Sequence, residues 1–270
     1  MTAVPTMKVN GATIAYTDTG PGAAETVLFG HGLLFGGWMF GAQIEALRDR
    51  YRCVTIDWRG QGDSPPAAGG YDMDTLTGDA VELIKALGLA PVHWVGLSMG
   101  GFVGQRIAAR HGELLRSLTL LDTSARPENP AKARDYKRLA LIQRLIGIKP
   151  ILSRVRPSLF GPAAPADAVG EWTRRIVRAD RAAVRRAVLG VAGRQPVLDE
   201  IGRITVPTLV VVGADDRATP PPESERMAAA IPGARLEVVA NCGHSCTLEQ
   251  PAAITGLLRS FLAVPRKEPA

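Results

Sequence analysis

The sequence has few cysteines, few aromatic residues and no long apolar run. Three cysteines are too few to indicate a disulfide framework, although they leave room for one pair. No apolar run approaches the roughly 20 residues that cross a bilayer, and the opening MTAVPTMKVNG lacks the basic and apolar blocks of a signal peptide. We therefore expect a cytoplasmic protein without a membrane span.

The residues that are present are typical of an ordinary globular protein. Hydrophobic residues make up 46% of the 270 residues and charged residues 21%, so the composition gives no reason to expect disorder. The net charge of +6 comes from one stretch, because Lys132 to Arg194 holds fifteen Lys or Arg and only four Asp or Glu. The net charge could suggest an anionic partner, but the placement of the charges matters more than their sum, and we expect no nucleic-acid partner. The composition leaves the oligomeric state open.

Short apolar runs alternate with helical patterns in the first third of the chain, as in parallel sheets covered by helices on both faces. Apolar residues at helical spacing predict helices after Asp72, after Ser98 and from Pro251. The terminal PRKEPA is expected to be a loose tail. The predicted strands are Ala12 to Thr17, Thr26 to Phe29, Tyr51 to Ile56, Val92 to Leu97, Leu115 to Leu121, Thr208 to Val212 and Leu236 to Val239.

The alternation breaks from Asp122 to about Thr205, where prolines divide the chain into short helical pieces. We interpret residues 123–205 as a helical lid inserted into a core domain of residues 1–122 and 206–270. We expect the lid to present a solvated basic face above an apolar underside that closes a pocket. The alternative is that one or two arginines reach inward to a substrate carboxylate. In the segment from Arg174 to Arg186, four arginines are expected to fall on one helical face: Arg174, Arg178, Arg181 and Arg185.

Gly96-Leu97-Ser98-Met99-Gly100 matches the G-x-S-x-G nucleophile elbow and stands between a predicted strand and a predicted helix, the context that the motif requires. Small residues are needed around the serine because the turn is strained and the helix must lie close to the sheet. We expect Ser98 to be a nucleophile rather than an ordinary turn residue. The backbone N–H of Met99, at the helix start, is the natural first donor to an oxyanion.

With the elbow placed, the chain resembles the α/β-hydrolase superfamily from about Gly11 to Leu262. Within that superfamily it is similar to serine carboxylesterases and 3-oxoadipate enol-lactonase-like proteins. The resemblance implies a mostly parallel eight-stranded sheet with helices on both faces and a helical lid after the sixth strand. Besides the elbow, its motifs are His31-Gly32, the Asp57 to Ser64 loop (DWRGQGDS), GADDRATP from Gly213 to Pro220, and NCGH from Asn241 to His244.

The candidate triad combines the elbow with two later loops. His244 lies in a Gly-containing loop between the last predicted strand and helix, where it can reach Ser98 as a general base. In the family's G-x-x-D loop the acid stands three residues beyond the glycine, which implies Asp216. Asp215 and Asp122 are the alternatives for this acid.

The resemblance also assigns the residues around the triad. The residue after His-Gly, here Leu33, supplies the second oxyanion N–H, while His31 is expected to hold its loop by hydrogen bonds. The Asp57 to Ser64 loop is expected to pack under the site without a chemical role. The sequence Cys242-Gly-His-Ser-Cys246 raises the idea of a metal site, but buried thiols explain it better because no second Cys/His cluster is visible. We expect no cofactor and no metal.

The predicted reaction is hydrolysis of a small or medium carboxylic ester or lactone through an acyl-enzyme. Cofactor-free haloperoxidases (perhydrolases), carbon–carbon bond hydrolases and non-catalytic ligand receptors on the same fold are the alternatives. Cofactor-free haloperoxidases usually carry an aromatic residue where Leu33 stands. Phe40 is expected to pack in the core. An apolar substrate pocket is predicted from residues near the oxyanion loop and the elbow: Phe35, Trp38, Met39 and Phe102.

Overall fold

The predicted strands assemble into one sheet in the computed structural model, which describes residues 4–21, 23 and 25–264. Within these residues the sheet has eight strands in the order β1-β2-β4-β3-β5-β6-β7-β8. The predicted PRKEPA tail lies outside the described residues. The strands are β1 (Thr6–Val9), β2 (Ala12–Asp18), β3 (Thr26–Gly30), β4 (Arg52–Ile56), β5 (Val92–Leu97), β6 (Leu115–Leu121), β7 (Thr208–Gly213) and β8 (Arg235–Val239).

The sheet is antiparallel at one edge and parallel elsewhere. β2 pairs antiparallel with β1 and β4, whereas all pairings from β4 across to β8 are parallel. Every residue of β3, β5 and β7 is buried, as expected for parallel strands that are covered on both faces. The sequence did not predict β1, because its four residues include exposed Thr6 and Lys8 and it gains its structure by pairing with β2.

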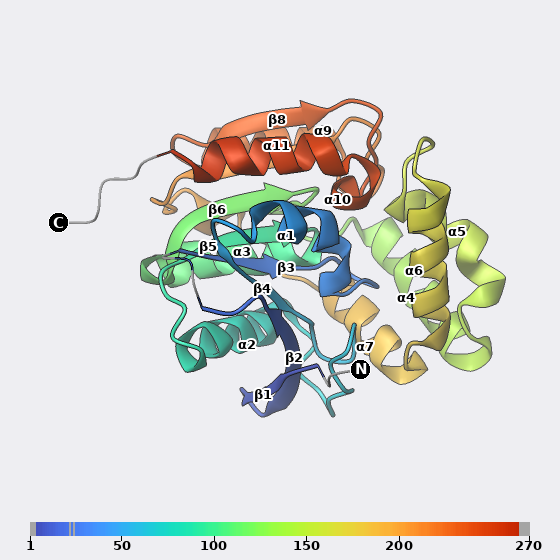
Figure 1. Ribbon diagram of the computed structural model, residues 1–270. Helices are drawn as coiled ribbons and strands as arrows, with labels where there is room; N and C mark the ends of the chain where they lie inside the picture. The colour runs from blue at the N-terminus through green and yellow to red at the C-terminus, as the bar shows by residue number, and fades with distance from the viewer. Residues whose placement is uncertain (1–3, 22, 24, 265–270) are drawn as a thin grey trace.

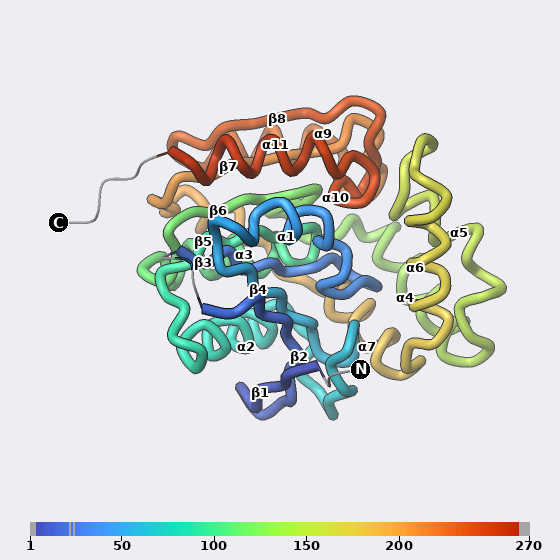
Figure 2. The backbone as a smooth tube through the Cα atoms, in the orientation of Figure 1, coloured from blue at the N-terminus to red at the C-terminus, as the bar shows by residue number. Residues whose placement is uncertain are grey.

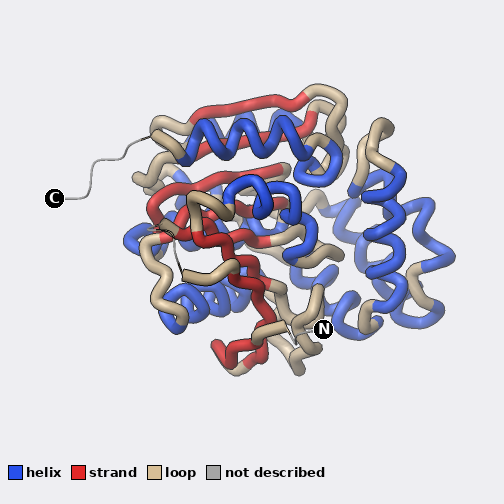
Figure 3. The backbone as a smooth tube through the Cα atoms, in the orientation of Figure 1, coloured by secondary structure: helices blue, strands red, loops and turns tan. Residues whose placement is uncertain are grey.

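Helices cover the sheet on both faces (Figures 1 and 3). Buried residues of α1 and α11 belong to one apolar cluster, and those of α2, α3 and α9 belong to another. No helix within the described residues is long and apolar enough to span a membrane. These covering helices are α1 (Gly41–Leu47), α2 (Met73–Ala86), α3 (Met99–Arg110), α9 (Pro221–Ala230) and α11 (Pro251–Leu262).

The chain between β6 and β7 is helical, and no strand occurs among its residues, all of which are described. Figure 2 shows this insertion beside the core, and in Figure 1 the arrowheads of β6 and β8 point toward it. It therefore lies at the edge where the parallel strands end. Its helices are α4 (Pro130–Ile146), α5 (Leu152–Leu159), α6 (Ala166–Arg178), α7 (Arg181–Ala192) and α8 (Leu198–Ile201).

The single basic helical face predicted for residues 174–186 is wrong. α6 ends at Arg178, and α7 begins at Arg181 after a new N-cap at Asp180, whose side chain accepts a 2.7 Å hydrogen bond from the N–H of Ala183. The four arginines therefore lie two on each of two helices. On α6, Glu171 pairs with the guanidinium groups of Arg174 and Arg175.

Candidate active site

Ser98 lies at a sharp turn between β5 and α3. Its backbone has φ 51° and ψ −108°, and a positive φ is strained for any residue with a side chain. The glycines around it permit close packing: a Cβ on Gly96 would lie 2.2 Å from the carbonyl oxygen of Gly100, and one on Gly100 would lie 1.9 Å from that of Gly30. The two glycines of the motif therefore stand where the backbone of one segment directly contacts the backbone of another.

Ser98, His244 and Asp216 form one hydrogen-bonded chain. The Nε2 atom of His244 lies 2.9 Å from the Ser98 Oγ atom, and its Nδ1 atom lies 2.9 Å from the Asp216 Oδ2 atom. All three residues are buried. Gly213 lets their loops meet, because a Cβ there would lie 2.4 Å from the carbonyl oxygens of Cys242 and Gly243. The structure thus brings together the three residues that the sequence singled out.

Asp216 and His244 influence each other's ionisation. The Asp216 carboxylate also accepts hydrogen bonds from the N–H groups of Ala218 and Thr219 and from the Thr219 hydroxyl. Burial opposes ionisation of Asp216, but the charge and hydrogen bond of His244 and the hydrogen bonds from Thr219 outweigh it and lower the pKa of Asp216. Burial likewise opposes a charged imidazole, yet the Asp216 carboxylate raises the pKa of His244. The pair is therefore suited to stabilise an imidazolium.

The two alternative aspartates are placed differently. Asp215 is exposed to solvent. Asp122 is fully buried and accepts hydrogen bonds from the N–H groups of Gly213 (2.8 Å) and Cys246 (3.3 Å). Burial and the nearby Asp216 carboxylate raise the pKa of Asp122 to about 8. Neither Asp215 nor Asp122 has a hydrogen bond to His244 within the described residues, so the geometry favours Asp216 as its partner.

Two backbone N–H groups beside Ser98 are free to bind an oxyanion. Those of Leu33 and Met99 donate to no acceptor within the described part of the chain. The Asp57 to Ser64 loop supports the loop that carries Leu33, because the Gln61 Oε1 atom accepts a 2.8 Å hydrogen bond from the N–H of Leu34. From the sequence, the Asp57 to Ser64 loop was expected only to pack. No local pattern signals this contact, which depends on the meeting of two loops.

His31 is bonded into the core. Its Nε2 atom accepts a 3.1 Å hydrogen bond from the N–H of Trp58, and its carbonyl oxygen accepts a 2.8 Å bond from the indole N–H of the same residue. Burial lowers the pKa of His31, which keeps the imidazole neutral. This environment agrees with the structural role expected for His31.

Glu249 holds the loop that carries His244, a role that no sequence pattern indicates. Its carboxylate accepts hydrogen bonds from the N–H groups of Gly243 (2.9 Å) and Ser245 (3.0 Å), and from that of Gly161 in the insertion (2.9 Å). A Cβ on Gly243 would lie 2.2 Å from the Gly161 nitrogen, so the two loops are in direct contact. Glu249 therefore joins the His244 loop to the insertion.

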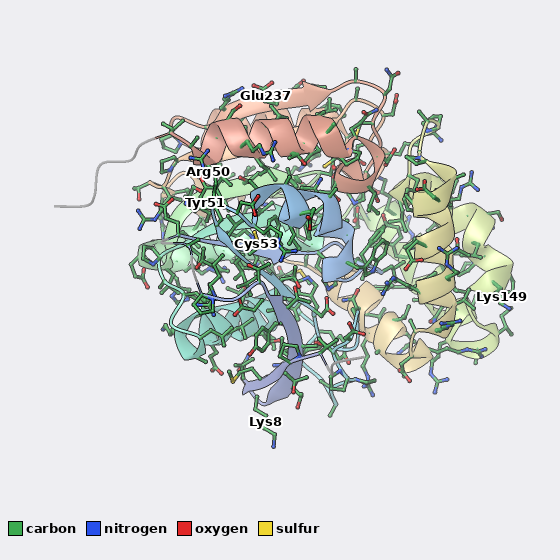
Figure 4. All side chains as sticks on the ribbon, in the orientation of Figure 1. Lys8, Arg50, Tyr51, Cys53, Lys149 and Glu237 are labelled. Carbon is green, nitrogen blue, oxygen red and sulfur yellow. The ribbon has the colours of Figure 1, made fainter. Side chains whose placement is uncertain are left out.

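All three cysteines are buried free thiols. Burial raises the pKa of Cys242 and Cys246, the two that flank His244, and neither takes part in the hydrogen-bonded chain of the site. Burial also raises the pKa of Cys53 to about 12; this residue is labelled among the strands in Figure 4. The thiols are therefore protonated packing residues.

A cavity of about 110 Å³ opens beside Ser98 and His244. The predicted residues Leu33, Phe35 and Phe102 line it. The sequence could not place the helices of the insertion, which supply most of the remaining wall. These helices, together with the short 3-10 helix Lys149–Ile151, contribute Tyr136, Leu139, Ala140, Gln143, Ile151, Arg154, Val155, Ser158, Leu159, Val184, Val188 and Val191.

Two of the predicted pocket residues do not line this cavity. Met39 is fully buried in the apolar core, because the short 3-10 helix Gly37–Phe40 turns it and Phe40 inward. Trp38 instead borders a neighbouring groove, where the guanidinium of Arg175 lies 4.9 Å from its ring centroid. Both assignments to the cavity are therefore wrong. Nearness in sequence to the oxyanion loop did not reveal which side chains face the cavity.

One arginine of the insertion lines the cavity, and it is not among the four that were assigned to the predicted basic face. Arg154 on α5 lines it, whereas Arg174, Arg178, Arg181 and Arg185 do not. Arg154 is exposed and also borders a groove between α4 and α5. The basic residues of the insertion are therefore mostly at its surface, as Figure 4 illustrates for Lys149.

A sequence profile of the alpha/beta hydrolase family matches residues 27–256, most of the chain. The chain belongs to the alpha/beta hydrolase family. This membership and the observed sheet confirm the fold class and the family predicted from the motifs. The protein is thus a hydrolase of this family.

This alpha/beta hydrolase is similar to solved structures over nearly its whole length. A thermophilic esterase from Thermogutta terrifontis is 32% identical with a TM-score of 0.87, and the match covers 96% of each chain. The enol-lactonase from Burkholderia xenovorans is 28% identical with a TM-score of 0.87, covering 96% of this chain and 99% of that one. A curated protein of Mycobacterium tuberculosis, "Putative non-heme bromoperoxidase", is 29% identical over 258 residues, 93% of this chain and 98% of that protein.

Proposed function

We propose that the protein hydrolyses small or medium carboxylic esters or lactones through an acyl-enzyme on Ser98. The observation that carries the proposal is the hydrogen-bonded chain from the Ser98 hydroxyl through His244 to Asp216. The unoccupied N–H groups of Leu33 and Met99 and the small apolar cavity support it. The names of the esterase and enol-lactonase structures agree with this class of substrate.

In the proposed reaction the Ser98 Oγ atom attacks the carbonyl carbon while its proton moves to the His244 Nε2 atom. The N–H groups of Leu33 and Met99 bind the oxyanion of the tetrahedral intermediate. As the intermediate collapses, the alcohol leaves with the proton from His244. Water then attacks the acyl group, again losing its proton to His244, and Ser98 regains a proton as the carboxylic acid departs. Asp216 holds the imidazole tautomer and stabilises its positive charge throughout.

Hydrolysis of p-nitrophenyl acetate and butyrate tests the proposal. We expect Ser98→Ala to lower turnover by on the order of 10⁴, while Ser260→Ala, at an exposed position of α11, leaves it unchanged. A serine-directed phosphonate should add one equivalent of mass to the Ser98 peptide alone. Equal rates for wild type and Ser98→Ala would leave only a ligand-binding role. Labelling that survives Ser98→Ala would contradict Ser98 as nucleophile.

The bromoperoxidase name of one relative motivates a second assay. A perhydrolase would use the same Ser98 to transfer the acetyl group of acetic acid to hydrogen peroxide with loss of water, and the peracetic acid formed would oxidise bromide. We expect ester hydrolysis to exceed peroxide-dependent bromination, because Leu33 is not aromatic. Bromination faster than ester hydrolysis would reverse the order of the two proposals. A carbon–carbon bond substrate cleaved faster than any ester would likewise contradict the proposed function.

A further inference from the structure

Gln143 is a buried polar side chain in the cavity that the proposed chemistry does not use. It lies on α4 and is only 4% exposed. Its side chain forms no hydrogen bond within the described residues, and its Oε1 atom is enclosed without a partner. An enclosed amide is unfavourable when nothing replaces its hydrogen bonds to water. The resting protein therefore carries a polar group that a ligand could satisfy.

Two other buried glutamines show how the fold normally holds this side chain. Gln43 donates from its Nε2 atom to the carbonyl oxygens of Thr247 and Pro251, and Gln105 donates to those of Gly101 and Ser124. Each thus joins two segments of backbone, although its Oε1 atom is unpaired. Neither lines the cavity. Gln143 differs from both, because neither end of its amide has a partner in the described chain.

Its place in the fold connects Gln143 to the reacting atoms. The cavity that it lines also contains Ser98 and His244. Tyr136, Arg154 and Ser158 line the cavity too, but they also border the outer groove between α4 and α5, whereas Gln143 does not. Gln143 instead stands between the cavity and a second hollow of about 290 Å³ beside α6 and α7. It is therefore placed to bind the end of a substrate that does not react.

We propose that Gln143 selects esters or lactones whose non-reacting end carries an uncharged hydroxyl or amide group, an assignment that rests on the hydrolysis proposed above. The side-chain amide presents one acceptor and two donor hydrogens, and rotation of its terminal torsion exchanges the two ends. A hydroxyl or an amide both donates and accepts, so it can pair with either end. An alkyl group leaves the amide unpaired, and a carboxylate pairs only with the donor end.

Three ethyl esters with the same heavy-atom skeleton test the assignment by proton release: ethyl N-acetylglycinate (amide), ethyl 4-methylpentanoate (alkyl) and monoethyl succinate (carboxylate). We expect kcat/KM for the amide ester to exceed that for the alkyl ester by about tenfold in the wild type. Gln143→Leu should reverse the order, lowering the first value and raising the second. Gln143→Met is a second variant of similar size. The control Gln195→Leu makes the same change at an exposed position of the insertion and should preserve the wild-type ratio.

Two readouts do not require turnover. Gln143→Leu should raise Tm because it removes an unpaired buried amide, whereas Gln105→Leu should lower Tm because it removes the hydrogen bond to the Ser124 carbonyl oxygen. In a Ser98→Ala background, the three esters can be titrated by NMR to compare binding. Amide-selective binding that disappears with Gln143→Leu supports the assignment even if no ester is hydrolysed, an outcome in which only the proposed function fails.

The assignment is overturned if Gln143→Leu leaves the amide-to-alkyl ratio at its wild-type value, since solvent in the second hollow then satisfies the amide. It is also overturned if the succinate ester is preferred and that preference survives Gln143→Leu. The selectivity would then belong to the exposed Arg154 guanidinium. Loss of turnover and of amide-selective binding together would refute both proposals.

Discussion

The contact between α3 and β3 behind Ser98 makes a quantitative prediction for Gly100→Ala. The new Cβ would lie 1.9 Å from the Gly30 carbonyl oxygen and 2.4 Å from its carbon. Ordinary carbon–oxygen contacts lie at about 3.3 Å or more, so the start of α3 must move by more than about 1 Å. Overpacking of this kind destabilises proteins by about 1–3 kcal/mol. A displacement of about 1 Å in catalytic groups can lower turnover by about 10²-fold.

Gly256→Ala provides the matched control, because it makes the same change in a helix without a clash. Gly256 lies inside α11 and is exposed, and a Cβ added there would meet no atom within 4 Å. Alanine is favoured over glycine there by about 1 kcal/mol through helix propensity, so the variant should be more stable than wild type.

Urea denaturation followed by tryptophan fluorescence, with p-nitrophenyl butyrate turnover at matched protein concentration, measures both effects. We expect Gly100→Ala to lose stability and turnover, and Gly256→Ala to gain stability at unchanged turnover. A folded Gly100→Ala protein within about 0.5 kcal/mol of wild type and with normal turnover would refute the steric reasoning. A destabilised Gly256→Ala protein would refute the propensity argument.

Three further predictions concern the triad and the cavity. Asp216→Ala should lower kcat/KM by on the order of 10⁴, whereas Asp215→Ala and Asp122→Asn should have far smaller effects. A larger loss of kcat/KM in either of the latter two variants would reject Asp216 as the acid. His244 must be neutral to act as the base, and the Asp216 carboxylate raises its pKa above the usual 6.5. We therefore expect kcat/KM to fall as the pH drops, with a midpoint above 6.5. A midpoint below 6 would contradict this. Because the cavity holds about 110 Å³, acetate to hexanoate esters should be favoured over long chains, and a preference for long-chain triglycerides would count against it.

The residues that could be predicted from the sequence are those set by local chemistry. The elbow could be predicted because backbone contacts at Gly96 and Gly100 permit only glycine. Asp216 and His244 follow short loops after strands, and the family pattern gives their spacing. The start of α7 could also have been predicted from the sequence, since Asp180 is a typical N-cap residue. Treating residues 174–186 as one helix ignored that signal.

What could not be predicted depends on contacts between distant segments. The hydrogen bonds from Leu34 to Gln61 and from Gly161 to Glu249 join parts of the chain that no local pattern relates. The unpaired amide of Gln143 becomes visible only when α4 is packed over the cavity. Met39 and Trp38 show the same limit, because a short 3-10 helix decides which side chains face inward.

The insertion joins the core between β6 and β7, while Ser98, Asp216 and His244 all come from loops of the core. The proposed catalytic residues and most of the cavity wall therefore come from separate stretches of the chain. Randomising residues 136–159 would change the cavity wall without altering Ser98, His244 or Asp216. Evolution and laboratory selection can exploit the same division. Gly161 lies just beyond this range and should be kept, because it contacts the loop that carries His244.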